Sequence, residues 1–418
     1  MLDKIKMYYI TQIFNKNKID NIPALISKEF DKINFSQKIK PGMKIGITVG
    51  SRGINNLIII LKSIIDEVKK RKGRPFIIPA MGSHGDACNE GQRKILASYG
   101  ITEKSMEVPI RATMDVVQLA KSDNGLPIFF DKHALEADGI IVVNRIKEHT
   151  VYKAEIESGL CKMLSVGLGN HQGATIVHIL GPGSIPENVL KFAQIILKKA
   201  PILCGLAILE DAYDNTSKIK VVNPSDFIKT DKELLIECKV NSPSLPVSNI
   251  DILILEEMGK NISGAGMDTN IVGGVKAYKI EEHKSPQIKK IVVLDLTTES
   301  HGNVLGVGIS DIITQKLYNK IDFKTTYKNV ITCGYLDRVK IPLVADTDKE
   351  AINIALKTTY NLPDVAPTII LIRNTLELGK MFVSENIWER IKHKGNITTI
   401  GGPRKLTFNS IGKLILKV

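Results

Sequence analysis

The 418-residue sequence lacks the features of several classes of protein. No run of apolar residues approaches the roughly 18 that a membrane span needs, and charges interrupt the first twenty residues too often for a signal peptide. The cysteines are odd in number, widely spaced and without a C-x-x-C pair: Cys88, Cys161, Cys204, Cys238 and Cys333. This pattern excludes a disulfide framework and a structural zinc site. We therefore expect a cytoplasmic protein with no membrane partner.

Aromatic residues are also scarce, at 5%, whereas 57 Lys and Arg exceed 44 Asp and Glu and give a net charge of +13. The one dense basic run, 69–72, is followed by Gly73, and such a run is typical of the C-terminus of a helix. The other lysines are scattered, and no aromatic platform for bases is evident. We expect no nucleic-acid partner, and the charge favours a small anionic ligand.

Short β-branched runs alternate with helical periodicity through the first half of the chain. Strands are predicted at 44–49, 75–80 and 138–144, with a helix over 55–72 between the first two. Each strand ends in a loop rich in Gly, Ser, Arg or His. Such alternation favours a mainly parallel sheet covered on both faces, and ligands bind at the carboxyl ends of its strands.

A proline-containing polar stretch at 241–249 then indicates a domain boundary. Beyond it, strands are predicted at 250–255, 290–296 and 368–372 and a helix at 348–358. The predicted fold class is α/β, with two α/β domains, mainly parallel sheets and a cofactor or substrate cleft between them. Residues 1–245 would form the N-terminal cofactor-binding domain, and residues 246–418 a C-terminal domain that closes over the site.

Four of the eight histidines lie in glycine-rich segments: His84 in GSHGD, and His149, His171 and His178 between residues 148 and 178. A histidine beside glycines at a strand end has few apolar neighbours, and the backbone there can approach a ligand closely. Imidazole suits proton transfer near neutral pH and metal ligation. These histidines are therefore candidates for a catalytic or metal-binding site.

Two cations have unusual surroundings. Lys162 lies in the glycine-punctuated apolar stretch 158–169, where loss of hydration can make its amine nucleophilic. Arg52, between Ser51 and Gly53 at a strand end, suits bidentate binding of phosphate or carboxylate. The glycines alone are weak evidence for a phosphate cradle, because neither GxxxxGK[ST] nor GxGxxG is present.

The order of these residues resembles that of the nickel-dependent lactate racemase family. The resemblance is strongest between residues 45 and 180 and weaker around 258–276. It implies a nickel-pincer nucleotide joined covalently to Lys162, within a cofactor-binding set that includes Ser51, Arg52 and Gly159. It also implies His178 as the nickel ligand.

The same resemblance implies two acid/base histidines, His84 and His149, and substrate contacts from Arg52 and Lys276. The implied activity is racemisation or epimerisation of a 2-hydroxy acid by hydride transfer. One histidine would take the hydroxyl proton for each enantiomer. Cofactor-synthesis proteins would be partners of the chain.

The sequence departs from the family pattern at three points. Val49 replaces the usual Asp three residues before Arg52, Leu160 replaces the second glycine of a Gly-Gly pair, and the spacing from His149 to Lys162 is about three residues longer. A divergent branch is implied. Two alternatives stay open: a non-racemising protein that binds an anionic nucleotide, and a metal-dependent hydrolase or lyase that uses His84, His149 and His171.

Overall fold

The computed structural model describes residues 2, 5–278, 280–360 and 365–418, and its internal contacts divide the chain into two units. The N-terminal unit comprises Asn15–Ser242, and the C-terminal unit comprises Met1–Phe14 with Pro243–Val418. The first fourteen residues, which we had assigned to the N-terminal domain, therefore belong to the other unit. The reason is strand pairing, because Met7–Thr11 pair antiparallel with Lys380–Ser384.

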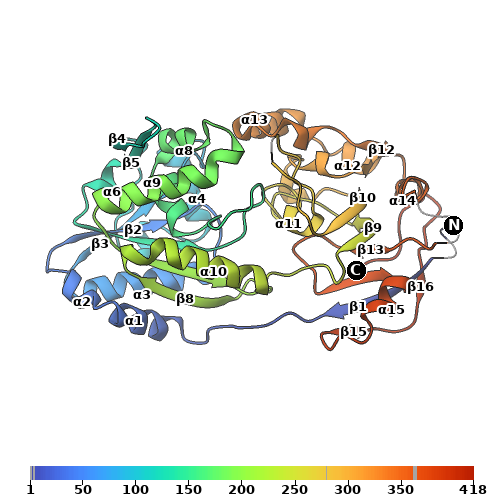
Figure 1. Ribbon diagram of the computed structural model, residues 1–418, viewed down its shortest axis with the longest axis horizontal. Coiled ribbons are helices and arrows are strands. Elements are labelled where there is room, and N and C mark those ends of the chain that lie inside the picture. The colour runs from blue at the N-terminus through green and yellow to red at the C-terminus, as the bar shows by residue number, and fades with distance from the viewer. Residues whose placement is uncertain (1, 3–4, 279, 361–364) are drawn as a thin grey trace. The chain divides into compact units, whose positions relative to one another are not determined.

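Most elements of the N-terminal unit are labelled in Figure 1. Its strands are β2 (Lys44–Val49), β3 (Arg74–Pro79), β4 (Val116–Lys121), β5 (Pro127–Asp131), β6 (Gly139–Arg145), β7 (Ile202–Glu210) and β8 (Thr216–Val222). Its helices are α1 (Ile22–Lys32), α2 (Phe35–Lys38), α3 (Leu57–Lys70), α4 (Asn89–Ser98), α5 (Glu103–Met106), α6 (Lys132–Leu135), α7 (Leu160–Lys162), α8 (Asn170–His178), α9 (Ile185–Lys199) and α10 (Phe227–Asn241). One turn of π-helix, η2 (Met163–Gly167), joins α7 to α8.

Five strands form the main sheet of this unit in the order β3-β2-β6-β7-β8, and all neighbours are parallel except β8, which is antiparallel to β7. Alternate residues of β2, β6 and β7 pack with α1 and α3 in one apolar cluster. On the opposite face of β7, Gly205 leaves room for Leu160 and Phe227. Helices therefore cover both faces, as the uninterrupted apolar strands predicted.

The connections of this sheet create a switch point between β2 and β6. From β2 the chain moves outward to β3, and it returns on the other side of β2 as β6 before moving on to β7. The loops that follow β2 and β6 therefore leave the sheet in opposite directions and open a crevice at the carboxyl ends of these strands. Ligands of open α/β sheets bind at such a crevice.

The C-terminal unit holds a nine-stranded sheet in the order β12-β11-β10-β9-β13-β14-β1-β15, with β16 paired to β1. Its strands are β1 (Lys6–Gln12), β9 (Asn249–Leu255), β10 (Gln287–Val293), β11 (Ile312–Thr314), β12 (Leu343–Ala345), β13 (Ile369–Ile372), β14 (Lys380–Ser384), β15 (Ile397–Thr399) and β16 (Arg404–Lys405). Its helices are α11 (Thr269–Val272), α12 (Gln315–Tyr318), α13 (Phe323–Cys333), α14 (Asp348–Lys357) and α15 (Glu385–Ile391).

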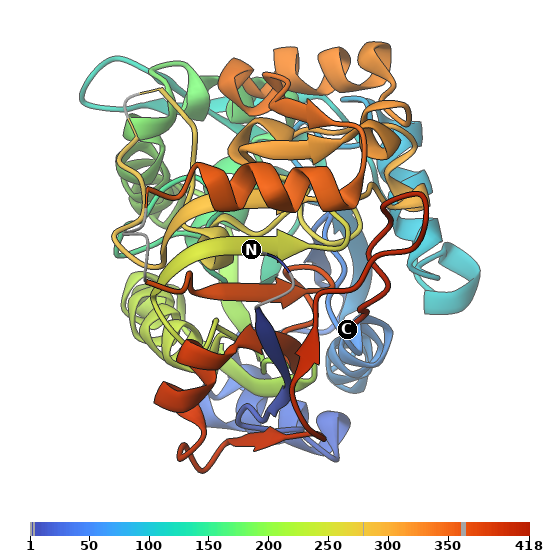
Figure 2. The same ribbon diagram turned by 90° about the vertical axis from the view of Figure 1, so that its right-hand side faces the viewer.

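The strands β12, β11, β10, β9 and β13 are parallel to one another. Strands β14, β1, β15 and β16 add antiparallel pairs. Alternate residues of β9 enter two apolar clusters, one on each face of the sheet. Figure 2 shows α14 lying across one of these faces. The predicted α/β class with mainly parallel sheets is confirmed. No helix in the described part of the chain has both the length and the apolar character that crossing a bilayer requires.

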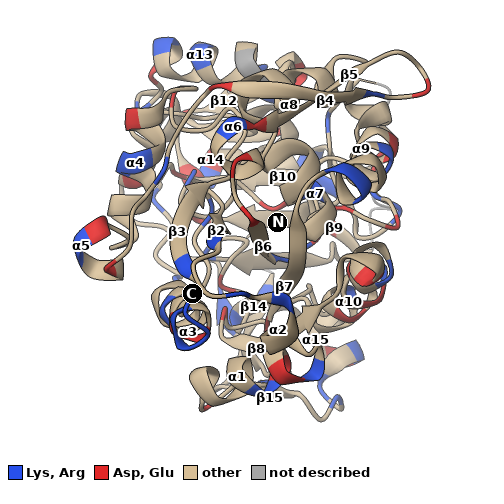
Figure 3. Ribbon diagram, turned by 90° about the vertical axis from the view of Figure 1, so that its left-hand side faces the viewer, with Lys and Arg blue, Asp and Glu red and all other residues tan. Residues whose placement is uncertain are grey.

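Charges of both signs occur together on the surface of the N-terminal unit. Figure 3 shows basic and acidic residues interspersed along α9 and α10. On α9, Lys191 pairs with Glu187 at 2.6 Å, and Lys229 and Glu233 lie one turn apart on α10. Such exposed pairs contribute little to stability. The charges of α10 balance, whereas α9 keeps an excess of lysine.

Candidate functional site

Three loops of the N-terminal unit leave the carboxyl ends of neighbouring strands. Residues 50–56 follow β2, residues 80–88 follow β3, and residues 146–159 follow β6. They carry Arg52, His84 and His149, and the last loop leads into the helix that bears Lys162. The main sheet thus brings the predicted site residues of this unit to one edge, which includes the β2–β6 switch point.

Ser51 and Arg52 begin the loop after β2. The Ser51 hydroxyl hydrogen-bonds Nδ1 of His84, and the Ser51 carbonyl accepts a hydrogen bond from the Tyr99 hydroxyl at 2.8 Å. The guanidinium of Arg52 is exposed, and no carboxylate in the described part of the chain lies within ion-pair distance of it. Val49, where the family pattern has Asp, is a buried apolar residue of β2. Arg52 is therefore available to bind an anion.

The loop that carries His84 packs closely against the π-helical turn after Lys162. The Gly82 amide donates to the Gly167 carbonyl at 3.1 Å. A Cβ at Gly167 would lie 2.8 Å from the Ala80 carbonyl oxygen, so only glycine permits this approach. The His84 amide donates to the Met81 carbonyl at 3.1 Å. The loop after β3 and the helix of Lys162 are thereby held together.

His149 lies in a loop that folds around a buried carboxylate. Glu157, whose side chain is fully buried, accepts the His149 amide at 2.6 Å and pairs with Lys239 at 2.6 Å. The His149 ring stacks on Tyr152 with 4.0 Å between centroids. Its Nδ1 accepts the Val151 amide at 3.2 Å, so a neutral His149 ring carries its proton on Nε2.

Lys162 occupies the last position of α7, directly before the π-helical turn. Its Nζ lies 5.9 Å from the centroid of the Tyr152 ring. The pKa of its amine is lowered to about 8, chiefly by burial and then by the positive charge of Arg52, while Glu157 opposes the change. No described carboxylate lies within ion-pair distance of Nζ. The Lys162 amine is therefore weakly basic, and the charge of the Arg52 guanidinium acts on it.

His178 closes α8, two helical turns after His171. Its Nδ1 lies 2.5 Å from the Ala174 carbonyl, which can only accept, so the ring proton is on Nδ1 and the lone pair on Nε2. Partial burial of the ring lowers the pKa of His178 and the charge of Lys162 lowers it further, while the hydrogen bond to Ala174 raises it; the residue as a whole is exposed. His178 is thus a neutral imidazole near Lys162 with Nε2 presented for ligation. His171 lies exposed at the start of the helix.

Lys276, the predicted substrate contact from the second half, belongs to the C-terminal unit. It is exposed, has a positive φ of 46° and donates its amide to Glu282 at 3.0 Å. The buried Arg338 donates Nε to the carbonyl of the preceding residue, Val275, at 2.8 Å. The backbone around Lys276 is thus held by contacts within its own unit.

The residues present fit a lysine-linked nucleotide that brings most of the metal ligands itself. Lys162 offers an amine, Arg52 an anion-binding group, and His178 one imidazole with its lone pair on Nε2. Within the described ranges, no three His, Cys, Asp or Glu side chains are grouped as a protein-only metal site would need. If such a nucleotide binds, Lys162 would be its attachment point and His178 would offer one imidazole to its metal.

Sequence reasoning missed the residues that shape this site from a distance. Glu157 and Tyr152 lie between two predicted site residues, His149 and Lys162, but their roles depend on the fold of the loop. Asp231, on α10, accepts backbone amides at the start of α7. It carries no motif, and only the packing of α10 against α7 shows its role.

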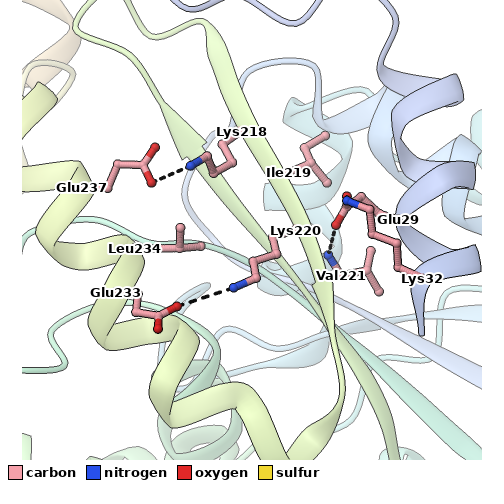
Figure 4. A pocket seen from close by; sticks show the side chains of 9 residues that line it. All are labelled: Glu29, Lys32, Lys218, Ile219, Lys220, Val221, Glu233, Leu234 and Glu237. Carbon is pink, nitrogen blue, oxygen red and sulfur yellow. Dashed lines mark hydrogen bonds and ion pairs between the residues drawn. The ribbon is translucent and has the colours of Figure 1, made fainter.

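A surface pocket of about 430 Å³ lies elsewhere in the unit, between α1, β8 and α10. Figure 4 shows its lysines turned toward its glutamates. Lys218 pairs with Glu237 at 2.6 Å and Lys220 with Glu233 at 3.6 Å. Its charges are balanced by ion pairs, in contrast to Arg52 and Lys162.

The structure is an α/β protein whose predicted site residues Arg52, His84 and His149 follow neighbouring strands of a mainly parallel sheet. Residues 6–175 match the model of the lactate racemase N-terminal domain. A comparison with curated proteins gives no significant match. The chain is similar in fold to the lactate racemase apoprotein from Thermoanaerobacterium thermosaccharolyticum, with a TM-score of 0.54 and 14% identity over 86% of this chain and 92% of that one. Residues 6–175 thus resemble the N-terminal domain of the lactate racemase family, and His178 lies just beyond the matched stretch.

Proposed function

We propose that this protein is a racemase or epimerase of a 2-hydroxy acid that uses a nickel-pincer nucleotide linked to Lys162. The observation that carries the proposal is the Lys162 amine, with its pKa lowered to about 8 beside the free guanidinium of Arg52. At pH 7.5 about a quarter of such amines are neutral, against about one in a thousand for an ordinary lysine. This roughly 200-fold difference favours a covalent role for Nζ.

The roles of the other residues follow from their positions. Lys162 would hold the nucleotide covalently, and Nε2 of His178 would ligate its nickel. When bound, the nucleotide would supply the acceptor for hydride from C2 of the substrate. His84 and His149 would exchange the hydroxyl proton, and His149 holds a proton at Nε2 while Val151 occupies its Nδ1. Arg52 would bind the substrate carboxylate, with Lys276 as a second contact.

The test is intact-mass and nickel analysis of protein produced together with the cofactor-synthesis machinery. We expect a single adduct that maps to Lys162 and about one nickel per chain. The Lys162→Arg variant keeps the charge but lacks the nucleophilic amine, and it should carry neither. A 2-hydroxy acid of one configuration should then racemise with the wild type only. Wild-type protein without an adduct and without nickel would overturn the proposal.

A nucleotide-binding protein without racemase activity remains the alternative favoured by the same cations. It requires that nucleotide bind without a covalent link. Lys162→Arg should then retain nucleotide binding, because the charge is unchanged. Equilibrium dialysis of both proteins against a nicotinic acid mononucleotide distinguishes the two functions.

A further inference from the structure

A buried carboxylate caps the helical turn that carries Lys162. Asp231 is 1% exposed and lies on α10, about seventy residues after Lys162 in sequence. We propose that Asp231 is a positioning residue: by holding the first turn of α7 it fixes the Lys162 side chain in its partly desolvated place. The inference rests on the role proposed above for Lys162, and it adds a residue that no sequence motif marks.

Both oxygens of Asp231 are used in this contact. Oδ1 accepts the Leu160 amide at 2.9 Å, and Oδ2 accepts the Cys161 amide at 2.8 Å. The first amides of a helix have no partner within the helix, and a buried helix end must find partners elsewhere. A carboxylate that satisfies two of them is a strong, directional cap, because charge-assisted hydrogen bonds are stronger than neutral ones. Lys162 is the next residue.

The same turn is held from the side of the sheet. Nδ2 of Asn144, near the end of β6, donates to the Gly159 carbonyl at 2.6 Å. A Cβ on Gly159 would lie 2.5 Å from Oδ1 of Asp231, so the carboxylate accounts for glycine at this position. The start of α7 is thus fixed between β6 and α10. It cannot shift without breaking a buried hydrogen bond.

Asp231 affects Lys162 by fixing where the side chain lies. The charges that act on the pKa of the Lys162 amine are those of Arg52 and Glu157, and burial is the largest cause. Loss of the cap would let the turn loosen and admit water to Nζ. The pKa of Lys162 would then rise toward its ordinary value, and the neutral amine would become scarcer at a given pH.

The test uses cofactor-free protein and competitive acetylation with acetic anhydride, read at Lys162 by peptide mass spectrometry from pH 6.5 to 10. Asp231→Asn keeps the shape of the side chain but places a donor against one amide. We expect the labelling midpoint to rise by about one pH unit, which slows labelling at pH 7.5 about eightfold. Asp131→Asn is the matched control, because Asp131 is also a buried helix cap in this unit and does not contact α7.

A second variant keeps the inference testable if Asp231→Asn does not fold. Gly159→Ala retains the carboxylate and displaces it with a methyl group, and it should shift the midpoint in the same direction. A folded Asp231→Asn or Gly159→Ala protein whose Lys162 labels like the wild type would overturn the inference. An equal rise of the Lys162 labelling midpoint in Asp131→Asn would also overturn the inference, because it would indicate a general loss of stability. The labelling experiment uses cofactor-free protein, so its result does not depend on the adduct. A wild type that never forms the adduct in the mass analysis would overturn the proposed function but not the inference about Asp231.

Discussion

Replacing Arg52 with glutamine should raise the pKa of Lys162. The guanidinium is the second cause, after burial, of the fall from 10.5 to about 8. A nearby like charge shifts a pKa by on the order of one unit, so we expect a rise of about one unit in Arg52→Gln. The neutral fraction at pH 7.5 would then fall from about one in four to about one in thirty. Glu157→Gln should act in the opposite direction, because Glu157 supports the charged form.

Competitive acetylation of Lys162 measures both variants. Arg52→Gln should label about eight times more slowly than the wild type at pH 7.5, and Glu157→Gln should label up to about twice as fast. Glutamine at 157 keeps an acceptor for the His149 amide, so the loop retains that hydrogen bond. Arg93→Gln removes an exposed arginine that pairs with Glu103 and serves as the control. Shifts of the same sign in Arg52→Gln and Glu157→Gln would refute the assignment of these charges to the Lys162 amine.

Further predictions concern Asp131 and His178. Burial raises the pKa of Asp131 to about 6, so between pH 3.8 and 6 the folded chain binds a proton more tightly than the unfolded chain. Proton binding by Asp131 therefore stabilises the folded chain at acid pH, and this contribution is lost as the pH rises through 6. Relative to wild type, Asp131→Asn should gain about 2 kcal/mol of unfolding free energy from pH 4 to pH 7, measured by urea unfolding. A difference in unfolding free energy between the two proteins that stays the same across that pH range would contradict this prediction. Lys162→Met should raise the pKa of His178, because the charge of Lys162 lowers it, and NMR of the histidine ring follows the change. Lys191→Met, on α9, should leave the pKa of His178 unchanged.

The sequence predicted the strands that are buried on both faces. The predicted strands at 44–49, 75–80 and 138–144 correspond to β2, β3 and β6 within one residue at each end. These strands read as continuous apolar runs between glycine-rich loops, and that pattern is distinctive. Strand β1 was missed because its alternating pattern is short and its partners, β14 and β15, lie more than 350 residues away.

The sequence predicted the position of some candidate site residues at strand ends, and their roles stay predictions. Arg52, His84 and His149 follow β2, β3 and β6, and a parallel sheet brings such positions to one edge. Glu157 and Asp231 were not predictable in this way. Their roles depend on which backbone amides face them, and that depends on how a loop and α10 pack. A buried carboxylate on a helix has no sequence signature of its own, whereas a glycine-flanked histidine does.

Of the cations that give the chain its net charge of +13, those near the site differ in whether a carboxylate pairs with them. Near the site, Arg145 pairs with Glu210 and Lys239 with Glu157, so these positive charges are already balanced. Arg52 and Lys162 have no carboxylate within ion-pair distance among the described residues, and each acts on the other through repulsion. Holding two like charges together costs free energy unless an anion joins them. An anionic ligand that contacts both cations would recover that cost, and this requirement is met by a phosphate as well as by a carboxylate. Under either of the two proposed functions, we therefore expect an anion to bind at this pair of cations.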